Sequence, residues 1–87
     1  MTYKTRIETR LAALTPTSLE VIDDSEKHRG HGGYREGGET HFTVRIVSPA
    51  FAGLGRVARH RLVNELLAQE LKERVHALAI EARAPGE

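Results

Sequence analysis

Residues 41–71 decide the fold, and they read HFTVRIVSPAFAGLGRVARHRLVNELLAQEL. The first six residues alternate between polar and apolar side chains, with Phe42, Val44 and Ile46 sharing one parity. Alternation with a period of two is typical of a β-strand that turns one apolar face toward a core. We therefore expect a half-buried strand at the start of this stretch.

A short helical turn and then a long helix are predicted after this strand. Ser48 is a candidate N-cap with Pro49 at the first helical position, and glycines at 53 and 55 end the turn. An apolar stripe at helical spacing then predicts one helix over residues 56–72, with the stripe in the core. The stripe consists of Val57, Leu62, Val63, Leu66, Leu67 and Leu71.

The segment before residue 41 adds a helix and a strand. Tyr3, Ile7, Leu11 and Leu14 recur at helical spacing. A proline follows at position 16 and ends this helix, because proline disfavours helical geometry in the residue before it. The run LEVI then reads as a short strand, which the polar cluster DDS ends.

The last strand and the element order complete the fold prediction. VHALAIEA, residues 75–82, reads as a strand, and residues 83–87 form a polar tail. The order helix, strand, strand, short helix, helix, strand predicts a single α+β domain over residues 1–87, built in two layers. Its three-stranded mixed sheet carries the helices on one face, while the other face is comparatively open. The first two strands pair antiparallel, and the third, reached through a helical crossover, runs parallel to its neighbour.

The loop between the first two strands is long and rich in glycine. The stretch DDSEKHRGHGGYREGGETHF, residues 23–42, holds three of the five histidines and five of the eight glycines of the chain. We expect a flexible loop over about residues 25–39. Loops of this length inside a compact domain are usually functional or disordered. A solvated loop is the simpler interpretation, and a ligand-binding loop is the alternative that the histidines raise.

Composition excludes several classes of function. The 87 residues include no cysteine, which excludes disulfides and thiolate-only metal sites. The formal charge of +1 is too small to indicate nucleic-acid binding by itself. No apolar run approaches the ~20 residues of a membrane span, and the N-terminal MTYKTRIETR lacks a signal-peptide core. We therefore expect a cytoplasmic protein. We also expect that it is not an enzyme, because no Ser/His/Asp constellation, HExxH pair or Walker loop is present.

Three local motifs together resemble the BolA family. They are Thr-His-Phe at residues 40–42, Arg-His-Arg at 59–61 and Val-His-Ala-Leu at 75–78. They lie in ETHFTVRIVSPAFAGLGRVARHRLVNELLAQEL and VHALAIEARAP, with EVIDDSEKH upstream. The resemblance covers nearly the whole chain and implies a class II KH-like fold, which agrees with the element order predicted above.

The same resemblance implies a partner and a cofactor. Members of the resembled family look like partners of monothiol glutaredoxins, with which they share a [2Fe–2S] cluster. The glutaredoxin and a glutathione contribute thiolates to this cluster. Carried over to this chain, the ligand at the head of the last strand is His76. The loop ligand is His28, with His31 as the alternative. The implied function is iron–sulfur trafficking or iron sensing, and the isolated protein is expected to be a monomer without a cluster.

Nucleic-acid binding is the competing interpretation. KH-like domains clamp backbone phosphates with a GxxG loop, and members of the resembled family have also been viewed as DNA-binding transcriptional regulators. Here Gly53 and Gly55 precede Arg56, Arg59 and Arg61 near a helix start, where backbone amides can meet phosphate. The spacing is GxG rather than GxxG, and the literal GHGG lies in the hairpin loop.

The other two histidines are predicted to be structural or solvated. His41 lies on the non-core parity of its strand, where a hydrogen bond to a neighbour is expected. His60 lies between two arginines within the long helix, where packing or surface exposure is the simplest role.

Overall fold

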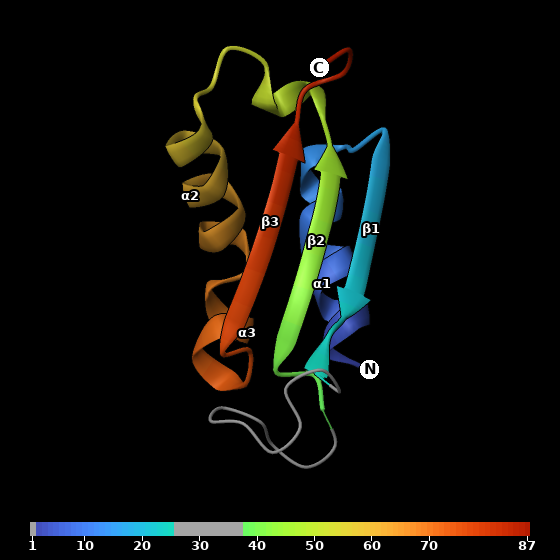
Figure 1. Cartoon of the computed structure of the whole chain (residues 1–87), viewed down its shortest axis with the longest axis vertical. Helices are drawn as coiled ribbons and strands as arrows, with labels where there is room; N and C mark the ends of the chain where they lie inside the picture. Colours follow the sequence, from blue (N-terminus) through green and yellow to red (C-terminus); the bar gives the residue numbers. More distant parts are fainter. Residues whose placement is uncertain (1, 26–37) are drawn as a thin grey trace.

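The computed structural model, which describes residues 2–25 and 38–87, contains the predicted three-stranded mixed sheet (Figure 1). The central strand β2 (His41–Val47) pairs antiparallel with β1 (Ser18–Asp23) and parallel with β3 (Ala77–Arg83). Both strand directions predicted from the element order are confirmed.

The helices lie together on one side of this sheet, and its other side faces the viewer uncovered in Figure 1. They are α1 (Tyr3–Leu11), α2 (Arg56–Leu66) and α3 (Ala68–Glu73). None of these helices, nor any other in the described part of the chain, is long and apolar enough to cross a bilayer. The core between the helices and the sheet consists of Ile7, Leu11, Val21, Phe42, Val44, Ile46, Phe51, Val63, Leu67, Val75 and Ala84.

The alternation along β2 separates the two faces of the sheet. Val44, at its centre, is fully buried, as are its apolar neighbours of the same parity. On the opposite face, Arg45 lies between its cross-strand neighbours Glu20 and Glu81. Its guanidinium contacts both carboxylates, at N–O distances of 3.2 and 2.8 Å respectively. The open face therefore carries one cross-strand row of exposed charges at its centre.

Both ends of α1 follow local rules. The Thr2 hydroxyl caps the helix by accepting the N–H of Thr5 at 3.1 Å. The α-helix ends at Leu11 rather than at Leu14 as expected, and a 3-10 turn covers the last three residues. The residue before the proline, Thr15, then adopts a positive φ of 45°. The chain thus leaves helical geometry immediately before the proline.

The predicted short helical turn after β2 is confirmed as a 3-10 helix at Pro49–Phe51. The Ser48 hydroxyl accepts the N–H of Ala50 at 3.1 Å and donates to the carbonyl of Leu14 at 2.6 Å. Because Ser48 is fully buried, this hydroxyl ties the end of β2 to the turn after α1.

The single helix predicted over residues 56–72 is wrong, because the structure has two helices there. The backbone of Leu67 leaves helical geometry, with φ −100° and ψ 11°, at the junction of α2 and α3. One member of the apolar stripe is also misplaced, since Val57 is 71% exposed. Nine residues, or two and a half turns, separate Val57 from Leu66, and this spacing puts the two side chains on opposite sides of α2.

A buried carboxylate holds α3 against α1. Glu70 is fully buried, and its carboxylate lies 2.8 Å from Nη2 of Arg6 and 3.2 Å from Nε of Arg10. The Glu70 carbonyl accepts the N–H groups of Arg74 and Val75, both at 3.0 Å. The end of α3, and with it the entrance to β3, is therefore fixed relative to α1.

Candidate functional site

His76 stands at the entrance to β3 with its side chain exposed. The strand begins one residue later, at Ala77, and the preceding residue, Val75, is buried. The backbone N–H of His76 donates to the carbonyl of Thr40 at 2.8 Å, and that of Ala77 donates to the same carbonyl at 3.2 Å. The backbone of His76 is thus held in place while its imidazole faces outward.

The outgoing end of the long loop is held beside the same threonine. Ser25 is 1% exposed, and its Oγ accepts the N–H of Thr40 at 2.8 Å and that of His41 at 3.3 Å. The N–H of Ser25 itself donates to a carboxylate oxygen of Asp23 at 2.9 Å. Ser25, which follows β1, and Thr40, which precedes β2, therefore form one buried contact.

The returning end of the loop is held by two further bonds. The Nε–H of Arg74 donates to the Gly38 carbonyl at 2.9 Å, and the N–H of Tyr3 donates to Oε1 of Glu39 at 2.5 Å. Gly38 has a φ of +71°, and a Cβ there would lie 3.4 Å from the Cβ of Ser25. The positive φ favours glycine here. Hydrogen bonds therefore hold both described edges of the loop predicted over residues 25–39.

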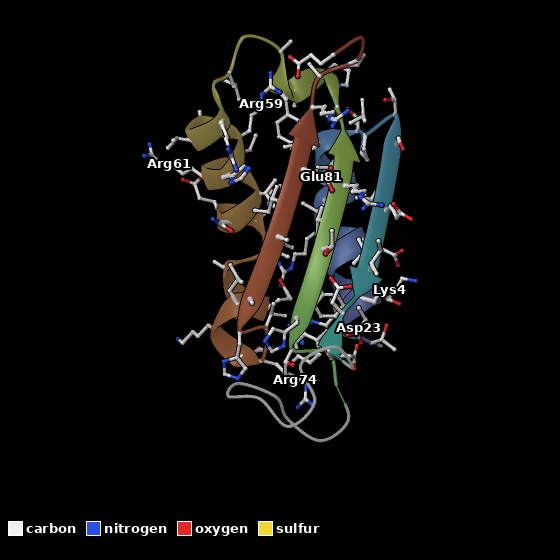
Figure 2. All side chains as sticks on the ribbon, viewed as in Figure 1. Lys4, Asp23, Arg59, Arg61, Arg74 and Glu81 are labelled. Carbon is white, nitrogen blue, oxygen red and sulfur yellow. The ribbon has the colours of Figure 1, made fainter. Side chains whose placement is uncertain are left out.

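Figure 2 shows Asp23 and Arg74 at this end of the sheet, on the side where β1 ends and β3 begins. His41 is 7% exposed here, and its Nδ1 lies 2.8 Å from the Thr40 hydroxyl. A hydrogen bond from His41 to a neighbour was expected, and this contact fits a structural role.

The sequence-predicted ligands fall partly within this site. His76 is described, whereas His28 and His31 lie outside the described residues. Within residues 2–25 and 38–87, no group of three or more His, Asp or Glu side chains could hold a metal ion. Sequence reasoning missed the buried hydroxyl pair of Ser25 and Thr40, because polar residues at the edges of a glycine-rich loop give no sign of burial.

The residues of the nucleic-acid interpretation lie at the opposite end of the sheet, near the start of α2. Gly53 has a φ of +79°, and Gly55 is the N-cap residue of α2. Arg56 and Arg61 are exposed, but the Arg59 side chain is only 13% exposed. In Figure 2, Arg61 points away from the sheet and Arg59 points toward the C-terminal end. The arginines therefore do not form one cluster.

The chain matches a family model and several known proteins. The model described as BolA-like protein matches residues 11–87. An "Uncharacterized protein in cobS 5'region" of Sinorhizobium sp is 53% identical, over 100% of this chain and 96% of that protein. The "DNA-binding transcriptional regulator BolA" of Vibrio cholerae is 52% identical over 75% of this chain, and this chain spans 58% of its length. Among solved structures, the BolA domain of SufE1 from Arabidopsis thaliana superposes with a TM-score of 0.87 at 48% identity, covering 98% of this chain and 94% of that one.

Proposed function

This chain belongs to the BolA-like protein family, and on that premise we propose that it is an adaptor that binds a monothiol glutaredoxin and co-ligates a shared [2Fe–2S] cluster. One observation carries the proposal. The carbonyl of Thr40 accepts the N–H of His76, while the N–H of Thr40 donates to Ser25, three residues before His28. The two chain segments from which nitrogen ligands are expected thus start from one buried contact.

The donor set of the chain suits half of such a centre. A chain without cysteine can offer imidazole nitrogen but no thiolate, so the glutaredoxin and glutathione would supply the sulfur ligands. His76 would bind from the strand entrance, and His28 or His31 from the loop. Replacement of thiolates by imidazoles on one iron raises the reduction potential of a two-iron cluster.

The buried bonds around Thr40 give these residues a defined role in binding. Every fixed backbone group reduces the conformational entropy that is lost when a ligand is held. His76 is fixed through Thr40, and Val75 before it is buried in the core. The imidazole of His76 therefore needs only side-chain ordering to meet a cluster presented by the partner.

Visible circular dichroism tests the proposal. Cluster-loaded monothiol glutaredoxin with glutathione is mixed with wild-type protein, and with the variants His76→Ala, His28→Ala and His31→Ala. The wild type is expected to change the spectrum, and His76→Ala to abolish the change. The loop variant that also abolishes it identifies the loop ligand. His60→Ala, on α2, is the matched control and should behave as wild type. An unchanged spectrum with wild-type protein would contradict the proposal.

DNA binding is the second candidate function, favoured by the name of the Vibrio cholerae relative and by the exposed Arg56 and Arg61. Fluorescence anisotropy with labelled duplex and single-stranded DNA, at two salt concentrations, tests it. Binding through these arginines should weaken as salt rises and should weaken further in Arg56→Gln and Arg61→Gln. Binding that ignores both salt and these substitutions would contradict this second function.

A further inference from the structure

A turn after β3 points the side chain of Glu87 back at α2. Ala84 is 6% exposed, and its carbonyl accepts the N–H of Glu87 at 3.2 Å. Pro85 and Gly86 occupy the middle of this turn, and Gly86 has a φ of +88°. Proline followed by a glycine of positive φ is the signature of a type II turn. The direction of Glu87 is therefore built into the turn.

The carboxylate of Glu87 meets three converging N–H donors. Nη1 and Nη2 of Arg59 lie 2.5 and 2.6 Å from its two oxygens. The backbone N–H of Ala84 donates to Oε1 at 3.0 Å. In this geometry the arginine guanidinium donates two parallel hydrogen bonds to the carboxylate. A phosphate can accept the same pair of hydrogen bonds.

The Arg59 fork is oriented by bonds that do not involve Glu87. Its Nε donates to the Leu54 carbonyl at 2.8 Å, and Nη1 also donates to the Ala82 carbonyl at 3.1 Å. The Arg59 side chain is 13% exposed, whereas that of Glu87 is 44% exposed. The Arg59 donor groups are therefore mostly buried, whereas the Glu87 carboxylate is partly exposed at the surface.

The local charge is suited to an anion. The Arg59 hydrogen bond, followed by that of the Ala84 backbone, lowers the pKa of Glu87 to about 2, and the charge of Arg83 acts in the same direction. Half-exposed ion pairs contribute little free energy. A free anion can therefore compete with the Glu87 carboxylate for the same donors.

We propose that the Arg59 guanidinium and the Ala84 N–H form a binding site for a phosphate-type oxyanion, which Glu87 occupies as a tethered competitor. The site does not depend on the cluster function, because His76 lies at the other end of β3.

Amide NMR with inorganic phosphate at constant ionic strength tests the site. The signals of the Ala84 amide and of the Arg59 Nη–H groups report directly on the proposed donors. Glu87→Ala removes the competitor and is expected to bind phosphate about two- to sixfold more tightly than wild type. Glu81→Ala is the matched control, because it also removes a carboxylate paired with an arginine, but on the open sheet face. It should bind phosphate as wild type does.

A double variant checks that the arginine fork is the receptor. Arg59→Lys combined with Glu87→Ala keeps the positive charge but loses the bidentate geometry, so the gain from Glu87→Ala should vanish. If that variant fails to fold, the location of the phosphate-induced NMR shifts in the single variant Glu87→Ala tests the site. Shifts confined to the Ala84 and Arg59 signals support the site, and equal shifts at Ala79 on β3 overturn it.

A second titration, with a single-stranded oligonucleotide, identifies the source of the anion. Tighter binding of both phosphate and oligonucleotide by Glu87→Ala supports a site for nucleic-acid backbone. Tighter binding of phosphate alone supports a site for a small phosphorylated molecule. If Glu87→Ala binds neither ligand more tightly than Glu81→Ala, the proposed site does not exist.

Discussion

The two ends of the sheet are closed by different chemistry. At the His76 end, defined by Ser25, Thr40 and His76, the contacts are bonds of buried hydroxyl and backbone groups, and the imidazole stays exposed. At the Arg59 end, defined by Arg59 and Glu87, the contact is an ion pair whose carboxylate is 44% exposed. A buried neutral group is costly to leave without its partner, whereas a half-exposed ion pair contributes little and can exchange its partner. The first end suits fixed presentation of a ligand, and the second suits competition.

The helices reinforce this contrast. Behind the His76 end, the fully buried Glu70 joins α3 to α1 through Arg6 and Arg10. Behind the Arg59 end, α2 starts at Arg56, and its N-cap residue, Gly55, provides no side-chain cap. The two ends are therefore expected to respond very differently to loss of a charged partner.

The largest effect is expected from the double variant Arg6→Ala with Arg10→Ala. It leaves the Glu70 carboxylate buried without its counter-charges, and loss of a buried partner costs about 3–5 kcal/mol of unfolding free energy. Urea denaturation followed by circular dichroism measures the change. Because α3 leads directly into the His76 end, the variant should also weaken the spectral change with cluster-loaded glutaredoxin.

Arg45→Ala is the matched control for this variant. Arg45 also contacts two carboxylates, those of Glu20 and Glu81, but all three side chains are about half exposed. Exposed pairs of this kind contribute about 0.2–1 kcal/mol, so Arg45→Ala should cost far less. Equal losses in the two variants would contradict the contrast between buried and exposed pairs.

An intermediate effect is expected from Ser25→Ala. The variant leaves the buried N–H of Thr40 without its acceptor, which costs about 1–3 kcal/mol. Hydrogen exchange at the Thr40 and His41 amides should become faster, and the change in visible circular dichroism with glutaredoxin should weaken. Urea denaturation, amide exchange and the cluster assay measure the three effects.

A second buried serine provides the control. Ser48 is also fully buried, with its hydroxyl bonded to Leu14 and Ala50, but it lies at the far end of β2. Ser48→Ala should lose a similar unfolding free energy without affecting the cluster assay. If both variants weaken the cluster assay equally, the effect of Ser25 is one of global stability and the special role of the His76 end is refuted.

Sequence patterns predicted most of the fold because its elements obey simple periods. The alternation at Phe42, Val44 and Ile46 predicted a strand with one buried face, and the Ser48–Pro49 pair predicted the 3-10 turn. The break at Leu67 was missed, because leucine, alanine and glutamine around it are all good helix formers. Val57 was misassigned because apolar character alone does not fix the angular position of a residue on a helix.

The candidate site was less predictable than the fold. His76 could be singled out because the resemblance points to the head of the last strand. The bonds that fix it come from Thr40, 36 positions earlier, and such a long-range contact leaves no local pattern. The Arg59–Glu87 pair was missed for the same reason. The arginine was grouped with Arg56 and Arg61 by sequence proximity, although its ion-pair partner, Glu87, lies in the turn after β3.

The smallest effect on stability is expected from loss of the Arg59–Glu87 pair, and pH titration is the sensitive measurement. Glu87 and Glu73 both have a pKa lowered from 4.5 to about 2, the former chiefly by Arg59 and the latter chiefly by Gln69 and then Arg6. A carboxyl whose pKa is lowered on folding stabilises the protein fully above its ordinary value of 4.5. This contribution disappears as the pH falls through about 2.

Titration of Glu87 and Glu73 in one experiment reports separately on the Arg59 end and the His76 end of the sheet. In Arg59→Gln, the midpoint of Glu87, followed by carboxyl carbon NMR, should rise from about 2 toward 4.5, because the group that holds it ionised is gone. The midpoint of Glu73, at the His76 end, should stay at about 2, since its partners are unchanged. A Glu87 midpoint that stays low in Arg59→Gln would show that Arg59 does not hold the carboxylate. The Arg59 end would then be closed by the turn alone.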